Sequence, residues 1–156
     1  MKTLSLRLLI FCACLISTLG AHAGGAASKT FGGFTAGQKF SLTIVQATSS
    51  RAVGTKVEQK TPVPDGVPVF KPKQKVKFAI GKKGELTGPG FSIPLLNTTP
   101  NTNSYAKQPT QSTPSPINAS VFRDTKGKPV GVALTFYQYR VSGTRLTINL
   151  VGYVLK

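Results

Sequence analysis

Histidine, cysteine and tryptophan are absent from this chain or confined to its first residues. The sequence has no tryptophan, and its single histidine and two cysteines are His22, Cys12 and Cys14. Without that first segment, neither a Ser-His-Asp nor a Cys-His arrangement can form, and zinc and copper lose their usual ligands. We therefore expect no metal site, no cofactor and no disulfide bond in the rest of the chain.

Carboxylates are also scarce, since only Glu58, Asp65, Glu85 and Asp124 are present. A hydrolase that uses paired carboxylates would need two of these scattered residues to converge. Asp65 lies in a Pro-Asp-Gly triplet and Asp124 opens a Lys-Gly turn, which are common turn positions. We expect that the protein is not an enzyme. A secreted hydrolase using carboxylates or a Ser-Lys pair is the remote alternative.

The first 23 residues have the three parts of a secretory signal peptide. Lys2 and Arg7 are followed by an apolar run over 8–19 and by the triplet Ala21-His22-Ala23. A span needs about 20 apolar residues, so a permanent anchor is the weaker interpretation, as is a lipid on either cysteine. We expect cleavage after Ala23, a secreted or periplasmic protein, and no transmembrane segment in the mature chain.

Apolar and polar residues alternate along four segments of the mature chain, which is the period of a half-buried β-strand. The segments are 40–44, 76–80, 130–136 and 146–154, the last with Leu146, Ile148, Leu150 and Val154 on one face. Glycine-containing turns separate the segments, and no stretch of ten residues has a clear helical period. The sequence predicts an all-β fold, a single small antiparallel sandwich or barrel. Its last 40 residues are expected to form a three-stranded meander.

The mature chain of 133 residues is long enough for one domain. We expect a flexible N-terminal tail over 24–36 and a β domain over 37–156. Within this domain, 61–73 contains four prolines, which excludes a central strand, and is expected to be a proline-rich connection. The segment 97–116 is rich in Asn, Thr, Ser and Pro and is expected to be a long surface loop.

Positive charge is the most pronounced feature of the mature chain, which has 18 Lys and Arg against four carboxylates and a net charge of +14. Six lysines fall within 13 residues and are here called the basic stripe; they are Lys71, Lys73, Lys75, Lys77, Lys82 and Lys83. Lys73, Lys75 and Lys77 are two residues apart, so a strand would place them on one face. Such a face could bind a polyanion, or it could be a solvated face that protects an edge strand.

Tyr137 and Tyr139 are expected on one face of the third predicted strand, opposite Leu134 and Phe136, with Tyr153 on a neighbouring strand. Exposed tyrosines on a sheet can stack bases or sugars. They can equally pair across strands or cover a core. We retain Tyr137 and Tyr139 beside the basic stripe as candidate binding residues.

These observations favour an exported, non-catalytic basic β protein. Its expected partners are polyanions of the cell envelope or the extracellular space, namely anionic glycan, lipid head groups or nucleic acid. Arginine is the better bidentate ligand for phosphate, and only four of the 18 mature cations are arginines. The alternative is a structural component of the envelope or matrix whose partner is another protein.

Overall fold

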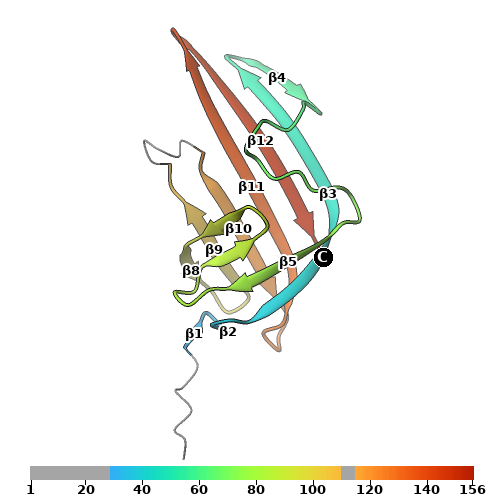
Figure 1. Ribbon diagram of the computed structural model, residues 1–156, viewed down its shortest axis with the longest axis vertical. Helices are drawn as coiled ribbons and strands as arrows, with labels where there is room; N and C mark the ends of the chain where they lie inside the picture. The colour runs from blue at the N-terminus through green and yellow to red at the C-terminus, as the bar shows by residue number, and fades with distance from the viewer. Residues whose placement is uncertain (1–28, 110–114) are drawn as a thin grey trace, which may run out of the picture.

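The computed structural model describes residues 29–109 and 115–156, and all regular elements in these ranges are β-strands, apart from turns. The strands are β1 (Thr30–Phe31), β2 (Phe34–Thr35), β3 (Lys39–Val53), β4 (Lys56–Gln59), β5 (Lys75–Ile80), β6 (Leu86–Gly88), β7 (Phe91–Ile93), β8 (Leu95–Thr98), β9 (Thr102–Lys107), β10 (Ile117–Arg123), β11 (Pro129–Ser142) and β12 (Arg145–Leu155). The predicted all-β fold is confirmed, and β10, β11 and β12 form the predicted meander (Figure 1). In these ranges no helix is long and apolar enough to cross a membrane. The expected signal peptide, 1–23, lies outside the described residues.

The main sheet has ten strands and curves into a nearly closed antiparallel barrel. Its order is β7-β6-β5-β3-β12-β11-β10-β9-β8, with β4 also paired to β3. The two edge strands, β7 and β8, are consecutive in the chain and are separated only by Pro94. Proline cannot donate to a ladder, so the chain leaves one edge of the sheet here and joins the other. The Pro94 carbonyl accepts a hydrogen bond from Ala106 N at 3.1 Å.

Aromatic rings form a continuous series of contacts through the interior of the barrel. Successive centroids are 5.0–6.3 Å apart in the order Phe34, Phe40, Phe78, Phe91, Phe136, Tyr153 and Phe70. Such pairs stabilise a core beyond the area that they bury. Because residues 29–109 and 115–156 contain no cysteine, no disulfide supplements this packing.

The proline-rich connection, 61–73, contains no strand and lies across the inner face of the sheet, between β4 and β5 (Figure 1). We call this segment the proline strap. Hydrogen bonds join it to β3, β11 and β12, among them those from Ser49 Oγ to the Thr61 carbonyl, from Gln138 Nε2 to the Asp65 carbonyl and from Tyr153 Oη to the Pro68 carbonyl. Phe70 is buried in the core, and Val63 and Val67 pack against it. The proline strap therefore covers one end of the barrel core.

Strands β3, β11 and β12 extend beyond the barrel and form, with β4, a second region of the same sheet (Figure 1). We call this region the upper sheet; it consists of β4 and residues 46–53, 137–142 and 145–154. Strand β10 pairs with β11 only as far as Phe136. Strand β5 pairs with β3 only as far as Thr43. The upper sheet is therefore not closed into a barrel; its outer face is open to contact, and the proline strap covers part of its inner face.

A β-bulge at Val45 determines which residues of β3 face inward in the upper sheet. Leu155 pairs with Ile44 and Val154 pairs with Gln46, so Val45 is the extra residue. Before the bulge the even-numbered side chains face the core, and after it the odd-numbered ones do. Arg51 therefore lies on the same face as the buried Val151 and Tyr153 of β12.

Two predicted irregular segments contain strands instead. In the predicted flexible tail, 24–36, β1 and β2 form a hairpin and Phe34 is fully buried, because its ring packs against Phe40 at 5.9 Å; residues 24–28 lie outside the described residues. In the predicted loop, 97–116, the end of β8 and all of β9 pair with each other, and β9 also pairs with β10. Asn103 and Tyr105 of β9 are buried, so their backbone needs the hydrogen bonds of a sheet.

Candidate functional site

The basic stripe extends along β5 and into the turns at both of its ends. Lys75 and Lys77 point outward, while Val76 and Phe78 are buried. Two lysines of the stripe lie in the turn before β5 and two in the turn after it, and all six are exposed. A strand of six residues is about 20 Å long, so the stripe matches an extended anionic chain better than a single small anion.

Lys73 is not part of the strand face that the two-residue spacing predicts. It lies in the turn before β5 with φ of 66°, a conformation that is uncommon for residues other than glycine. Its N–H donates to the Ile44 carbonyl at 2.9 Å, and Gln74 N donates to the Lys71 carbonyl at 3.0 Å. This turn interrupts the strand alternation before Lys75, so the shared strand face contains Lys75 and Lys77 alone.

The charges of the basic stripe are not neutralised within the part of the chain that the structure describes, where none of its six lysines forms an ion pair. Glu85, the nearest carboxylate in sequence, accepts a hydrogen bond from Lys83 N at 2.9 Å. Lys39 of β3 lies opposite Ala79 of β5 and lines, together with Lys77, a shallow depression of about 560 Å³. Lys39 thus adds a cation that the predicted site did not include. The alternation of polar and apolar residues that begins at Lys39 and Phe40 could have indicated its outward position.

The position of Lys75 and Lys77 is also compatible with edge protection. Among the described residues, β6 pairs with only Ala79 and Ile80 of β5, so the first part of β5 has β3 as its single neighbour. Lysines on such an edge prevent pairing with another chain. The geometry therefore supports both interpretations of the stripe that the sequence left open.

Tyr137 and Tyr139 lie side by side on the outer face of β11, with ring centroids 6.4 Å apart and planes 13° apart. They are opposite Leu150 and Ile148 of β12. Tyr153 is on the neighbouring strand, as expected, but on the inner face, where it is 2% exposed. Burial raises the pKa of the Tyr153 hydroxyl, while its hydrogen bond with the Phe70 backbone lowers it. Any tyrosine platform therefore consists of Tyr137 and Tyr139 without Tyr153.

Three of the four arginines in the described part of the chain line one open pocket of about 720 Å³ on the inner face of the upper sheet. We call it the arginine pocket; Arg51 of β3, Arg140 of β11 and Arg145 of β12 lie around it, and the start of the proline strap is one wall. The fourth arginine, Arg123, has a structural role, since it donates to the Thr99 carbonyl at 2.6 Å and lies over the Phe34 ring.

The strand register explains why these arginines share a face. Arg51 is opposite Asn149, and Arg140 is opposite Thr147. Arg145 is opposite Ser142, two residues along β11 from Arg140. The sequence contained the alternation of β11 and β12, but it gave no sign of the bulge that brings Arg51 to the same side.

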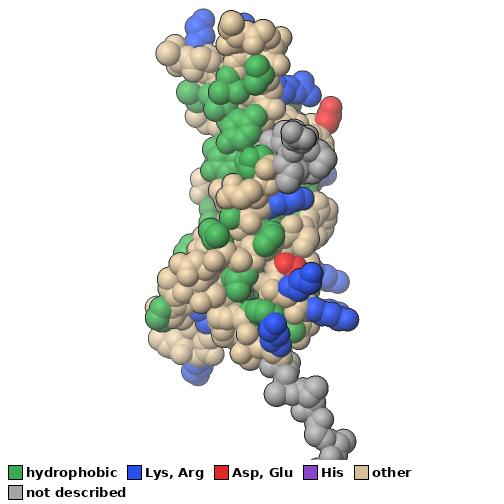
Figure 2. Space-filling model, turned by 90° about the vertical axis from the view of Figure 1, so that its left-hand side faces the viewer, with side chains coloured by type: hydrophobic (Ala, Val, Ile, Leu, Met, Phe, Trp, Pro, Cys, Tyr) green, Lys and Arg blue, Asp and Glu red, His purple; other side chains and the backbone are tan. Residues whose placement is uncertain are grey.

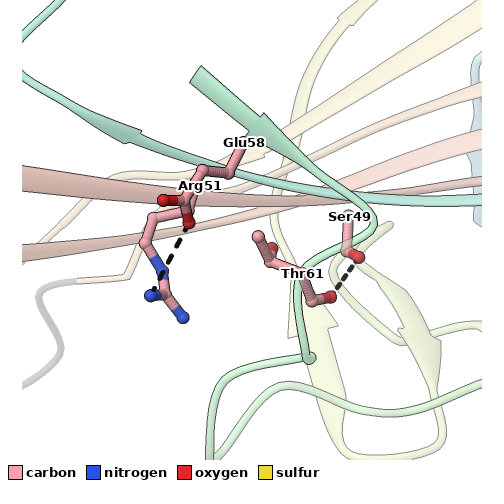
Figure 3. Close-up of polar contacts among 4 residues, drawn as sticks. All are labelled: Ser49, Arg51, Glu58 and Thr61. Atoms are coloured by element: carbon pink, nitrogen blue, oxygen red, sulfur yellow. Dashed lines mark hydrogen bonds and ion pairs between the residues drawn. The ribbon is translucent and has the colours of Figure 1, made fainter. Parts of the chain in front are cut away.

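Two carboxylates also line the arginine pocket, Glu58 of β4 and Asp65 of the proline strap. Glu58 forms an ion pair with Arg51 at 3.9 Å (Figure 3). The side chain of Glu58 is 63% exposed, and Asp65 is exposed as well. Both carboxylates can accept hydrogen bonds from a ligand in the pocket.

Among the described residues, the outer face of the upper sheet carries no charged side chain, and it is apolar along β12 although β3 contributes Gln46, Thr48 and Ser50. Leu146, Ile148 and Leu150 of β12 point outward, which means that the apolar face noticed in the sequence is turned away from the core. Val57 of β4 and Val141 of β11 lie on the same side and are 62% and 74% exposed. Figure 2 shows hydrophobic side chains gathered over the upper part of the molecule, with lysine and arginine mostly at the margins.

No protein-family model matches this chain, and neither a curated protein nor a solved structure is significantly similar to it. Within residues 29–109 and 115–156, no three His, Cys, Asp or Glu side chains are grouped so that they could hold a metal ion. The basic stripe, the arginine pocket and the apolar outer face are therefore the three features from which a function can be inferred.

Proposed function

We propose that this protein is exported, has no catalytic activity, and binds an anionic polymer of the cell envelope or the extracellular space along the basic stripe. The observation that carries the proposal is the outward pair Lys75 and Lys77, continued by lysines in the turns at both ends of β5. None of these charges has an ion-pair partner in the described part of the chain. A row of unneutralised cations attracts a polyanion and releases its counterions on binding.

The test measures binding to duplex DNA, to a heparin-like glycan and to anionic vesicles from about 50 to 300 mM salt, the range in which counterion release weakens binding steeply. We expect tight binding to one of the three that persists near physiological salt. Charge reversal of Lys73, Lys75 and Lys77 to glutamate should abolish it. If the partner is DNA, each lost contact should also reduce the log–log salt slope by about 0.9.

The matched control reverses three exposed lysines elsewhere, Lys29, Lys126 and Lys128. It changes the net charge by the same amount and leaves the basic stripe intact. Equal weakening in the control and in the stripe variant would refute the proposal, because it would mean that only net charge matters. Binding to all three polyanions that disappears by about 150 mM salt would refute it too.

A second candidate is a structural component that contacts another protein, and the apolar outer face of the upper sheet favours it. Uncharged surface with Val141 at 74% exposure is unusual on a protein of this charge, and large apolar patches mark interaction sites. A contact on this face would not depend on salt. The same titration therefore separates the two candidates, since salt-insensitive association with an envelope protein would support the second one.

A further inference from the structure

We propose that the arginine pocket binds a carboxylate-bearing sugar unit, so that the anionic polymer of the proposed function is an acidic glycan. This inference rests on the proposed function, because it takes the ligand to be one unit of an anionic polymer. It concerns different residues, on the opposite end of β3 from the basic stripe. In this proposal the arginine pocket recognises one sugar unit, and the basic stripe attracts the rest of the anionic polymer.

Arg140 and Arg145 are placed to hold one carboxylate together. They are diagonal neighbours on the inner face of β11 and β12, and such neighbours have Cβ atoms about 7–8 Å apart. Neither forms an ion pair among the residues that the structure describes. Because a guanidinium group can form two parallel hydrogen bonds with a carboxylate, one anionic group between these side chains can engage both.

The pocket has room for a ligand larger than an ion. A pocket of about 720 Å³ lies within the range of sites that hold small organic molecules. One water occupies about 30 Å³ in the liquid, so a lone inorganic anion would leave most of the pocket filled with water. A sugar unit with its neighbour would occupy far more of it.

The balance of charge around the pocket favours one negative charge per unit. Three arginines face two carboxylates, Glu58 and Asp65, across the lining, which leaves a single excess positive charge. A densely sulfated or phosphorylated unit would carry more negative charge than this excess can neutralise and would lie close to the two carboxylates. The hydroxyl groups of a sugar, in contrast, can donate hydrogen bonds to them.

The remaining lining is suited to hydroxyl groups and not to bases. Ser142 and Thr147 supply hydroxyl groups, Gln138 and Asn149 supply amides that also bond within the protein, and no aromatic ring lines the pocket. The other lining residues are apolar and can contact the C–H face of a sugar; they are Val53, Pro62, Val63 and Pro64. Single-stranded nucleic acid is usually held by stacking its bases on aromatic side chains. These features distinguish an acidic glycan from a nucleic acid as the ligand.

The test is an NMR titration of the isotopically labelled protein with trigalacturonic acid, with neutral maltotriose as the comparison ligand. We expect the largest shift changes at residues around 138–149 and 51–65 with trigalacturonic acid, and none there with maltotriose. The double substitution Arg140→Gln with Arg145→Gln should weaken binding about tenfold or more, since two charge-assisted contacts are lost. The double substitution to lysine should also weaken it several-fold, because lysine retains the charge and loses the bidentate geometry.

The matched control is Lys126→Gln with Lys128→Gln, which removes the same charge from the exposed turn between β10 and β11. An unchanged thermal unfolding midpoint in each variant shows that folding is intact. Absence of binding, equal binding of maltotriose, or equal loss in the control would overturn the inference. If polymer binding still depends on the basic stripe when trigalacturonic acid fails to bind, the inference fails and the proposed function stands. If trigalacturonic acid binds while reversal of the stripe has no effect on the polymer, the proposed role of the stripe fails.

Discussion

The hydroxyl of Tyr153 joins the proline strap to the core, and its removal should measure how firmly the strap is held. The hydroxyl donates to the Pro68 carbonyl at 2.9 Å. It also accepts a hydrogen bond from Phe70 N at 3.4 Å, in a buried position. The substitution Tyr153→Phe deletes both contacts and leaves the ring in place against Phe70 and Phe136.

The expected cost follows from what each partner loses. The bond to the half-buried Pro68 carbonyl accounts for about 0.5–1.5 kcal/mol, because water can partly replace it. Leaving the buried Phe70 N–H without a partner costs about 1–3 kcal/mol. Because its hydrogen bond to Tyr153 Oη is long, at 3.4 Å, we expect a cost near the lower end of this range. Tyr153→Phe should therefore lower the free energy of unfolding by about 2 kcal/mol, which for a domain of this size lowers Tm by about 6–10 °C.

Urea denaturation followed by circular dichroism measures this change, and Tyr139→Phe is the control. Tyr139 is 38% exposed, and loss of an exposed hydroxyl should change stability by less than about 0.5 kcal/mol. A loss below about 0.5 kcal/mol for Tyr153→Phe would refute the view that this hydroxyl holds the strap. An equal loss for both variants would refute it as well.

Two further predictions concern a turn and alkaline pH. Gly84→Ala should lower the free energy of unfolding by about 1–3 kcal/mol, because Gly84 has φ of 83° and a Cβ there would meet the Phe31 ring. The control Gly37→Ala should lower it less, because Gly37 has the same φ but open space around it. Equal urea midpoints for the two variants would contradict this prediction. Burial raises the pKa of Tyr105 and Tyr153, so the unfolded chain ionises first. The stability they confer is complete below pH 10 and should fall as the pH rises further. Urea midpoints at pH 9, 10 and 11 should fall less steeply for Tyr153→Phe, and parallel curves would contradict the assignment.

The β class and the meander could be predicted because both depend on local patterns. Alternation along 76–80 fixes which side of β5 is buried, and the glycine turns fix where β10, β11 and β12 reverse. The strand pairs that close the barrel could not be predicted in this way. Strand β3 pairs with β12, about 100 residues away in sequence, and no local pattern specifies such a partner.

The burial of β9 is a second feature that could not be predicted, because the composition of its segment is polar. Asn, Thr, Ser and Pro dominate 97–116, and this composition favours a loop. Yet Asn103 is fully buried in β9, where its Nδ2 donates to the Phe31 carbonyl at 3.2 Å. A single apolar residue, Tyr105, and pairing on both sides by β8 and β10 are enough to make this segment a strand.

The arginine pocket depends on one inserted residue in β3. Without the bulge at Val45, Arg51 would point to the outer face, beside Ile148 and Leu150, and would introduce a charge into the apolar surface. With the bulge, Arg51 joins Arg140 and Arg145 on the inner face, and β3 presents only uncharged side chains, Gln46, Thr48, Ser50 and Ala52, on the outer one. A shift of one residue moves every side chain of a strand to the opposite face. The bulge at Val45 thus keeps the charge of Arg51 away from the outer face, where the apolar residues of β11 and β12 lie, and adds that charge to the polar pocket on the inner face.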